Sequence, residues 1–168
     1  MMNYHAVIRS QYAASLAMLH QSIEKCPEAL WNQAADTAKF WHIAYHALFY
    51  THLYLNSTAT DFTPWPNHRP DYQFMGPIPW DGNRLPKIEE VYQKAELLDY
   101  LDFCRQHMES YVPTLDLAAP SGFDWLPMSK FELQIYTIRH LQQHTGELME
   151  RLGSRAGISV DWVGMAQW

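Results

Sequence analysis

The sequence predicts an all-α protein, a four-helix bundle with a long Pro/Trp-rich connection between its second and third helices. Apolar residues recur at helical spacing in four segments, while the alternation typical of strands is absent over any useful length. Prolines lie between these segments rather than within them, with six of the ten in residues 56–86. A chain of 168 residues, 48% of them hydrophobic, has the size of one globular domain, and we assign residues 1–168 to it.

The first two helices precede the long connection. We expect the first near residues 3–25, ended by Pro27, with an apolar stripe of Ile8, Tyr12, Leu16, Leu19 and Ile23. The second starts near Asp36 or Thr37, either of which can cap it, and runs to Leu55. Because this helix is apolar almost all round, we expect it at the centre of the bundle.

The last two helices follow the long connection. We expect the third to begin after Pro86 and to end before Pro113, with a stripe of Ile88, Val91, Ala95, Leu98 and Leu101. The fourth covers about residues 128–152, which contain no proline. On a helical wheel its core arc consists of Phe131, Ile138, Leu141, Thr145, Leu148 and Leu152.

Two connections, residues 56–86 and 113–127, are long for a helical bundle. Neighbouring antiparallel helices need only short links, so the first connection predicts that helices two and three run parallel. It contains Trp65 and Trp80. An aromatic loop of this length either covers a binding site or closes the end of the bundle.

Composition excludes several classes of partner. The net charge is −6 with no basic block, which excludes nucleic acid as a ligand. The most apolar stretch, residues 40–55, is interrupted by three histidines and is shorter than the roughly 20 residues of a membrane span. The N-terminal segment lacks the apolar run of a secretory signal. We therefore expect a cytoplasmic protein with no membrane partner, in which Cys26 and Cys104 are reduced thiols.

The most informative residues are His140 and His144 in the fourth helix. Residues i and i+4 of a helix lie one turn apart on the same face, so both imidazoles project together from the flank of the core arc. Neutral imidazoles are ligands for divalent transition metals, and a buried imidazole requires either hydrogen-bond partners or a metal. The pair therefore predicts two ligands of a metal site.

A metal site needs a third ligand from another helix. In the second helix, His42 and His46 share one stripe, while His52 lies on another. Helical spacing favours the first stripe without deciding between its two histidines. We interpret the remaining histidines as ordinary structural or surface residues: His5, His20, His68 and His107.

Glu147 lies one turn beyond His144 and is the candidate catalytic residue. It can accept a hydrogen bond from a ligating histidine, or act as a general base through a metal-bound water. It can equally form an ion pair with Arg151 at i+4.

The runs KFWHIAYHALFYTHLYL and IRHLQQHTGEL, with the Pro/Trp-rich loop between them, resemble the DinB/YfiT-like superfamily of four-helix-bundle metalloenzymes. The resemblance covers nearly the whole chain and implies an up-down-down-up bundle. It implies that one histidine of the second helix and the pair of the fourth bind a divalent metal. The matching positions are His46, His140 and His144, with His42 as the alternative to His46. Nickel and zinc are the foremost metals, and iron and copper also suit nitrogen ligands.

The same resemblance implies a function. Three imidazoles leave coordination positions open for water or substrate, which is typical of a catalytic site. Some relatives are thiol-dependent transferases, so we expect an enzyme for a small-molecule substrate, a transferase using a low-molecular-weight thiol or else a hydrolase. The alternative is a non-catalytic bundle, metal-binding or metal-free, with an interaction role. The relatives also imply a homodimer.

Overall fold

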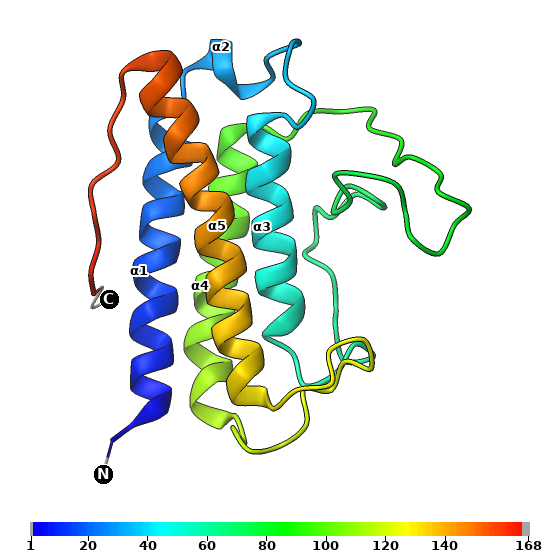
Figure 1. The fold of residues 1–168 in the computed structure, drawn as a ribbon, viewed down its shortest axis with the longest axis vertical. Coiled ribbons are helices and arrows are strands. Elements are labelled where there is room, and N and C mark those ends of the chain that lie inside the picture. Colours follow the sequence, from blue (N-terminus) through cyan, green and yellow to red (C-terminus); the bar gives the residue numbers. More distant parts are fainter. Residues whose placement is uncertain (1, 166–168) are drawn as a thin grey trace.

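The computed structural model describes residues 2–165 and confirms the all-α fold class (Figure 1). These residues form no β-strand, and Pro120 and Ser129 form an isolated antiparallel bridge. The helices are α1 (Tyr4–Lys25), α2 (Glu28–Trp31), α3 (Phe40–Tyr54), α4 (Lys94–Tyr111), the 3₁₀ turn η1 (Val112–Thr114) and α5 (Lys130–Ala156). The prediction of one domain over residues 1–168 extends to Met1 and to residues 166–168, which lie outside the described part.

The four long helices form an up-down-down-up bundle. In Figure 1, α1 and α5 run in one direction, while α3 and α4 run in the other. The long connection after α3 crosses back along the outside of the bundle, so α4 starts at the same end as α3. The prediction that helices two and three of the bundle run parallel is therefore confirmed.

Local signals explain the ends of α1 and α5. The Asn3 side chain caps α1 by accepting a hydrogen bond from the amide of Ala6 at 3.2 Å. Ser129 caps α5 in the same way, with the amide of Glu132 as donor at 3.2 Å. Gly157 ends α5 with a φ of 66°, a left-handed conformation that favours glycine.

The second bundle helix starts later than predicted, at Phe40 rather than at Asp36 or Thr37. Asp36 does not cap it because its carboxylate pairs with Arg155 at 2.6 Å and with Arg151 at 3.5 Å. These two arginines belong to α5, so the segment before α3 is tied across the top of the bundle. A tertiary contact therefore replaces the predicted cap.

The third bundle helix also starts later than predicted, at Lys94 rather than just after Pro86. The hydroxyl of Tyr72 accepts hydrogen bonds from the amides of Glu89 and Glu90, both at 2.9 Å, and holds this segment outside the helix. Gln93 then opens α4 with a capping box that includes Glu96. Ile88, which we expected in the helical stripe, is exposed.

Helix α3 does not lie at the centre of the bundle, where its apolar character predicted it, but at one side of it, between its neighbouring helices and the long connection (Figure 1). It packs against both α4 and α5 and is buried over almost its whole length. No helix in the described part of the chain has both the length and the apolar character required to cross a membrane.

The buried face of α5 differs from the predicted arc. Phe131 is 36% exposed and Ile138 is partly buried, whereas Leu133, Gln134 and Thr137 are buried. Helix α5 packs against both α1 and α3, so its buried face is wider than an arc drawn from apolar residues alone. Of the polar side chains added to this face, Gln134 accepts through its amide oxygen from the hydroxyl of Tyr12, and Thr137 donates to its own helix.

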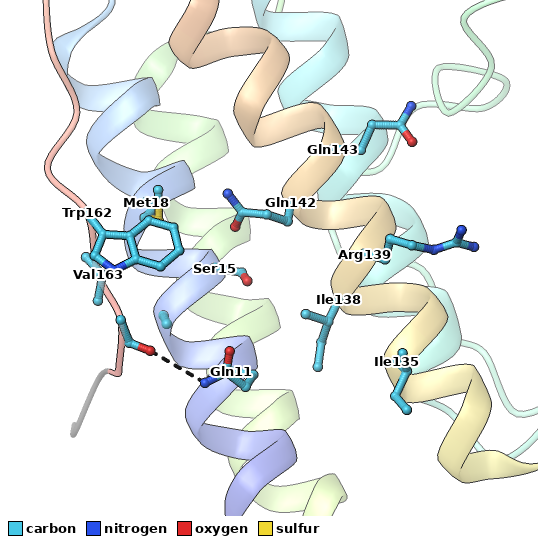
Figure 2. A pocket seen from close by; sticks show the side chains of 12 residues that line it. Gln11, Ser15, Met18, Ile135, Ile138, Arg139, Gln142, Gln143, Trp162 and Val163 are labelled. Carbon is cyan, nitrogen blue, oxygen red and sulfur yellow. Dashed lines mark hydrogen bonds between the residues drawn. The ribbon is translucent and has the colours of Figure 1, made fainter.

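The C-terminal segment after α5 turns back along α1 (Figure 1). Gln21 holds it by hydrogen bonds to the backbone of Asp161. Beside this segment a groove of about 630 Å³ lies between α1 and α5. Figure 2 shows Trp162 at the edge of this groove, with Gln142 and Arg139 projecting from α5.

Candidate metal centre

Three histidines from two helices converge beside the bundle core. His46 projects from α3, and His140 and His144 project from α5. One ring nitrogen of each lies within 4.8 Å of the others, and the Nε2 atoms of His46 and His140 are 3.2 Å apart. Nitrogens that share one metal at about 2.1 Å stand about 3.0–3.4 Å from each other. Small side-chain adjustments therefore bring the three nitrogens to ligating distances.

The histidines meet because α3 and α5 pack along much of their length. The i,i+4 spacing places His140 and His144 on one face of α5, with ring centroids 4.7 Å apart. His46 faces this pair from the middle of α3, at 5.1 Å from the first ring and 4.8 Å from the second. The site is therefore held by helices rather than by loops.

Hydrogen bonds at Nδ1 orient two of the three rings. The Nδ1 of His46 donates to the carbonyl oxygen of Gln73 at 2.7 Å. The Nδ1 of His144 lies 3.3 Å from a carboxylate oxygen of Glu147 and donates to it. A carbonyl or carboxylate partner on one ring nitrogen leaves the other nitrogen with a free lone pair, which is typical of metal-ligating histidines.

The third ring, His140, lacks such a partner. Its Nδ1 is buried and has no hydrogen-bond partner among the described residues, which is costly for a polar atom. Burial lowers the pKa of His140 to about 4 and the pKa of His46 to about 3. Both imidazoles are therefore neutral at physiological pH, and neutral imidazole is the form that binds metal. The donor set fits a divalent transition metal.

His42, the alternative third ligand, is engaged elsewhere. Its Nε2 lies 2.7 Å from the carbonyl oxygen of Tyr72, and its ring stacks on Trp41. Burial lowers its pKa. Among the described residues, the three-histidine group contains His46 and not His42. Whether these three bind metal stays a prediction.

The other histidines have structural partners. His52 is buried and its Nδ1 lies 3.2 Å from the hydroxyl of Tyr100. His68 pairs with the hydroxyl of Tyr45 at 2.6 Å and thereby ties the long connection to α3. His5 and His107 also bond to backbone carbonyl oxygens. His20 lies near Glu24 on α1.

Glu147 contacts both His144 and Arg151, the two partners that its position in the sequence allowed. One carboxylate oxygen accepts from His144 and the other pairs with Arg151 at 3.0 Å. Arg151 also reaches Asp36 and donates to the carbonyl oxygen of Ala38 at 2.7 Å. The carboxylate is therefore fixed between a histidine of the cluster and an anchored guanidinium. This geometry favours orientation of His144 over proton transfer.

A pocket of about 560 Å³ adjoins the cluster. His46 and Tyr50 line it from α3, and Trp80 lines it from the long connection. Trp65, the other tryptophan of that connection, is instead 3% exposed and stacks on Tyr100 in the core at 4.5 Å. The connection therefore both lines a pocket and closes part of the core.

Both cysteines are buried free thiols. Burial raises the pKa of Cys26 to about 12 and raises the pKa of Cys104 well above its ordinary value. Neither thiol is poised as a nucleophile.

Sequence reasoning missed the carbonyl group of Gln73, the ring of Tyr50 and the anchoring role of Asp36. A backbone carbonyl leaves no residue-type signal. Tyr50 lies one turn after His46, and this i,i+4 spacing is the signal that was present.

The family model of the DinB superfamily matches residues 11–148 of the chain. The matched part includes all three histidines of the cluster. Comparison with curated proteins and with solved structures finds no significant match.

Proposed function

The chain belongs to the DinB superfamily, and we propose that it is a metal-dependent enzyme that binds a divalent transition metal through His46, His140 and His144. The observation that carries the proposal is the convergence of three ring nitrogens within 4.8 Å. Burial keeps two of these rings neutral, and carbonyl or carboxylate partners orient two of them.

A three-histidine site leaves coordination positions for water or substrate. A metal bound there supplies Lewis acidity, which lowers the pKa of a coordinated water or thiol. The chain's own residues provide the rest. The carbonyl of Gln73 and the carboxylate of Glu147 hold two rings in place, and neighbouring aromatic side chains line the adjoining pocket.

Transfer of a low-molecular-weight thiol is the reaction we favour. In such a reaction the thiol loses its proton to solvent, and its sulfur forms a bond to an electrophilic carbon of the substrate. The leaving group departs with the electron pair of the broken bond. Hydrolysis is the second reaction, with water in place of the thiol. Nickel and zinc are the metals we favour, since both accept three nitrogen ligands.

Metal content tests the proposal. Protein purified without a polyhistidine tag or a nickel column should contain one transition metal per chain, or should take up one on reconstitution. His140→Ala should abolish stoichiometric uptake, while His20→Ala, which alters a half-buried histidine of α1 outside the cluster, should leave it unchanged. If the protein still contains no metal after reconstitution, the proposal is excluded.

Cobalt substitution tests the thiol. A small thiol that binds through sulfur should produce a sulfur-to-metal charge-transfer band in the cobalt protein. Cobalt binding without a spectral response to several thiols would leave metal binding intact and reject the thiol reaction.

A further inference from the structure

The pocket beside the histidine cluster is walled by uncharged side chains. None of its thirteen described lining residues is Asp, Glu, Lys or Arg. Six carry aromatic rings in addition to the imidazole of His46: Phe49, Tyr50, Tyr54, Phe74, Trp80 and Trp125. The tyrosine hydroxyls are neutral at physiological pH, because the ordinary pKa of a tyrosine is about 10. A charged ligand group inside the pocket would lose its hydration without gaining a counter-ion.

The pocket and the cluster share a wall. Tyr50 lines the pocket, and its ring lies 4.8 Å from the ring of His46 and 5.6 Å from that of His140. His46 lines the pocket as well. A molecule seated against these two residues is therefore next to the predicted metal site.

The walls contributed by loops are held in place. On one side, Arg84 pairs with Asp71 at 2.9 Å and with Asp81 at 2.6 Å, and its backbone bonds to that of Ile78. These contacts brace the segment that carries Phe74 and Trp80, whose rings meet edge to face at 5.2 Å.

On the other side, Trp125 donates from its indole to the hydroxyl of Tyr54 at 3.4 Å. The hydroxyl of Ser121 bonds to the carbonyl oxygen of Leu126 at 2.6 Å and closes the loop that carries this tryptophan. Contacts within the protein therefore fix both walls of the pocket, and small-molecule sites of this volume are usually pre-formed in this way.

The two tryptophans remain largely exposed although they border an apolar pocket. Trp80 is 77% exposed, and Trp125 is also exposed. Ring faces in this position are available to stack on a flat ligand, an arrangement that aromatic pairs favour.

We infer that this pocket binds an uncharged aromatic small molecule, or the uncharged aromatic portion of a substrate, between Trp80 and Trp125. The inference deepens the proposed function. That such a molecule reacts at the cluster rests on the proposed function. Binding in the pocket itself requires no metal.

The test is calorimetric titration of the full chain with three naphthalenes that differ in charge. They are 2-naphthylmethanol, which is neutral, 2-naphthoate, which is anionic, and 2-naphthylmethylammonium, which is cationic. The titrations use the protein as purified and after treatment with a chelator, because a carboxylate or amine can also bind a metal directly. In the chelated protein the neutral compound should bind one per chain, and both charged compounds should bind at least about tenfold more weakly.

Variants locate the site. Trp80→Ala and Trp125→Ala should each weaken binding of 2-naphthylmethanol by about three- to tenfold, since each removes one stacking face. Trp162→Ala is the matched control, because Trp162 is about as exposed as Trp80 but borders the groove between α1 and α5. Circular dichroism verifies that each variant is folded.

Equal binding of the three compounds, or no effect of either pocket variant, would overturn the inference. The two proposals fail separately. A chain that binds the neutral naphthalene but retains no metal rejects the metal centre alone, and a metal-loaded chain that does not bind the naphthalene rejects the pocket alone.

Discussion

Glu147→Ala tests how the cluster is oriented, because this carboxylate fixes the ring of His144 from the side opposite the predicted metal. Loss of such a partner typically weakens metal binding by about 10- to 100-fold. Two features place the expected effect at the lower end. The contact to Nδ1 is 3.3 Å, longer than the roughly 2.7–2.9 Å of a strong charge-assisted bond. The Glu147 side chain is 40% exposed, so water can take its place. We therefore expect Glu147→Ala to weaken metal binding about tenfold, which corresponds to about 1.4 kcal/mol of binding free energy.

The measurement is the Zn²⁺ dissociation constant, obtained by competition with a chromophoric chelator near neutral pH. Glu150→Ala is the matched control, because Glu150 lies on the same helix and is exposed. Equal dissociation constants for the two variants would refute the orienting role. A loss of turnover in Glu147→Ala with unchanged Zn²⁺ affinity would instead identify this residue as a general base.

Three further predictions follow from the described contacts. His46→Ala should abolish stoichiometric metal uptake in equilibrium dialysis while His42→Ala retains it, because His42 bonds to Tyr72 outside the cluster; the reverse result would exchange their roles. Free metal at a hundredfold excess over its dissociation constant should raise the free energy of unfolding by about 2.7 kcal/mol, an increment that a chelator removes in urea titrations. Metal-free protein should lose stability as the pH falls below about 6.5, the ordinary pKa of histidine. In the folded protein the pKa is about 3 for His46 and about 4 for His140, so the unfolded state binds more protons in this pH range. The loss by pH 5 is at most about 2 kcal/mol per histidine, and an equal pH dependence of the His46→Gln variant would contradict it.

The parts of the fold that sequence predicts are those with local causes. The end of α1 before Pro27, the start of α5 near Ser129 and the pairing of His140 with His144 follow from capping, proline and helical spacing. The parallel course of α3 and α4 follows from the length of the chain between them.

The errors arise where distant residues compete with local signals. Asp36 has a capping side chain, yet two arginines of α5 claim its carboxylate, and α3 begins four residues later. Ile88 continues an apolar period, but Tyr72 binds the nearby amides and α4 begins only at Lys94. The sequence alone does not reveal that these arginines and this tyrosine contact the two segments, because the contacts exist only in the folded chain.

The choice of His46 over His42 has the same origin. Both lie on one stripe of α3, and helical spacing alone does not separate them. The difference is that two successive residues of the long connection offer carbonyl groups to different rings, Tyr72 to His42 and Gln73 to His46. His46 bonds through Nδ1 and keeps Nε2 toward the cluster, whereas His42 uses Nε2 for its carbonyl.

Gln73 thereby connects the cluster to the pocket. Its carbonyl group orients His46, and the same residue lines the aromatic pocket together with its neighbour Phe74. A shift of this segment would therefore change both the position of a predicted ligand and the shape of the aromatic pocket. The geometry of the cluster therefore depends on the irregular connection, braced by Arg84 and Tyr72, as well as on the helices that carry the histidines.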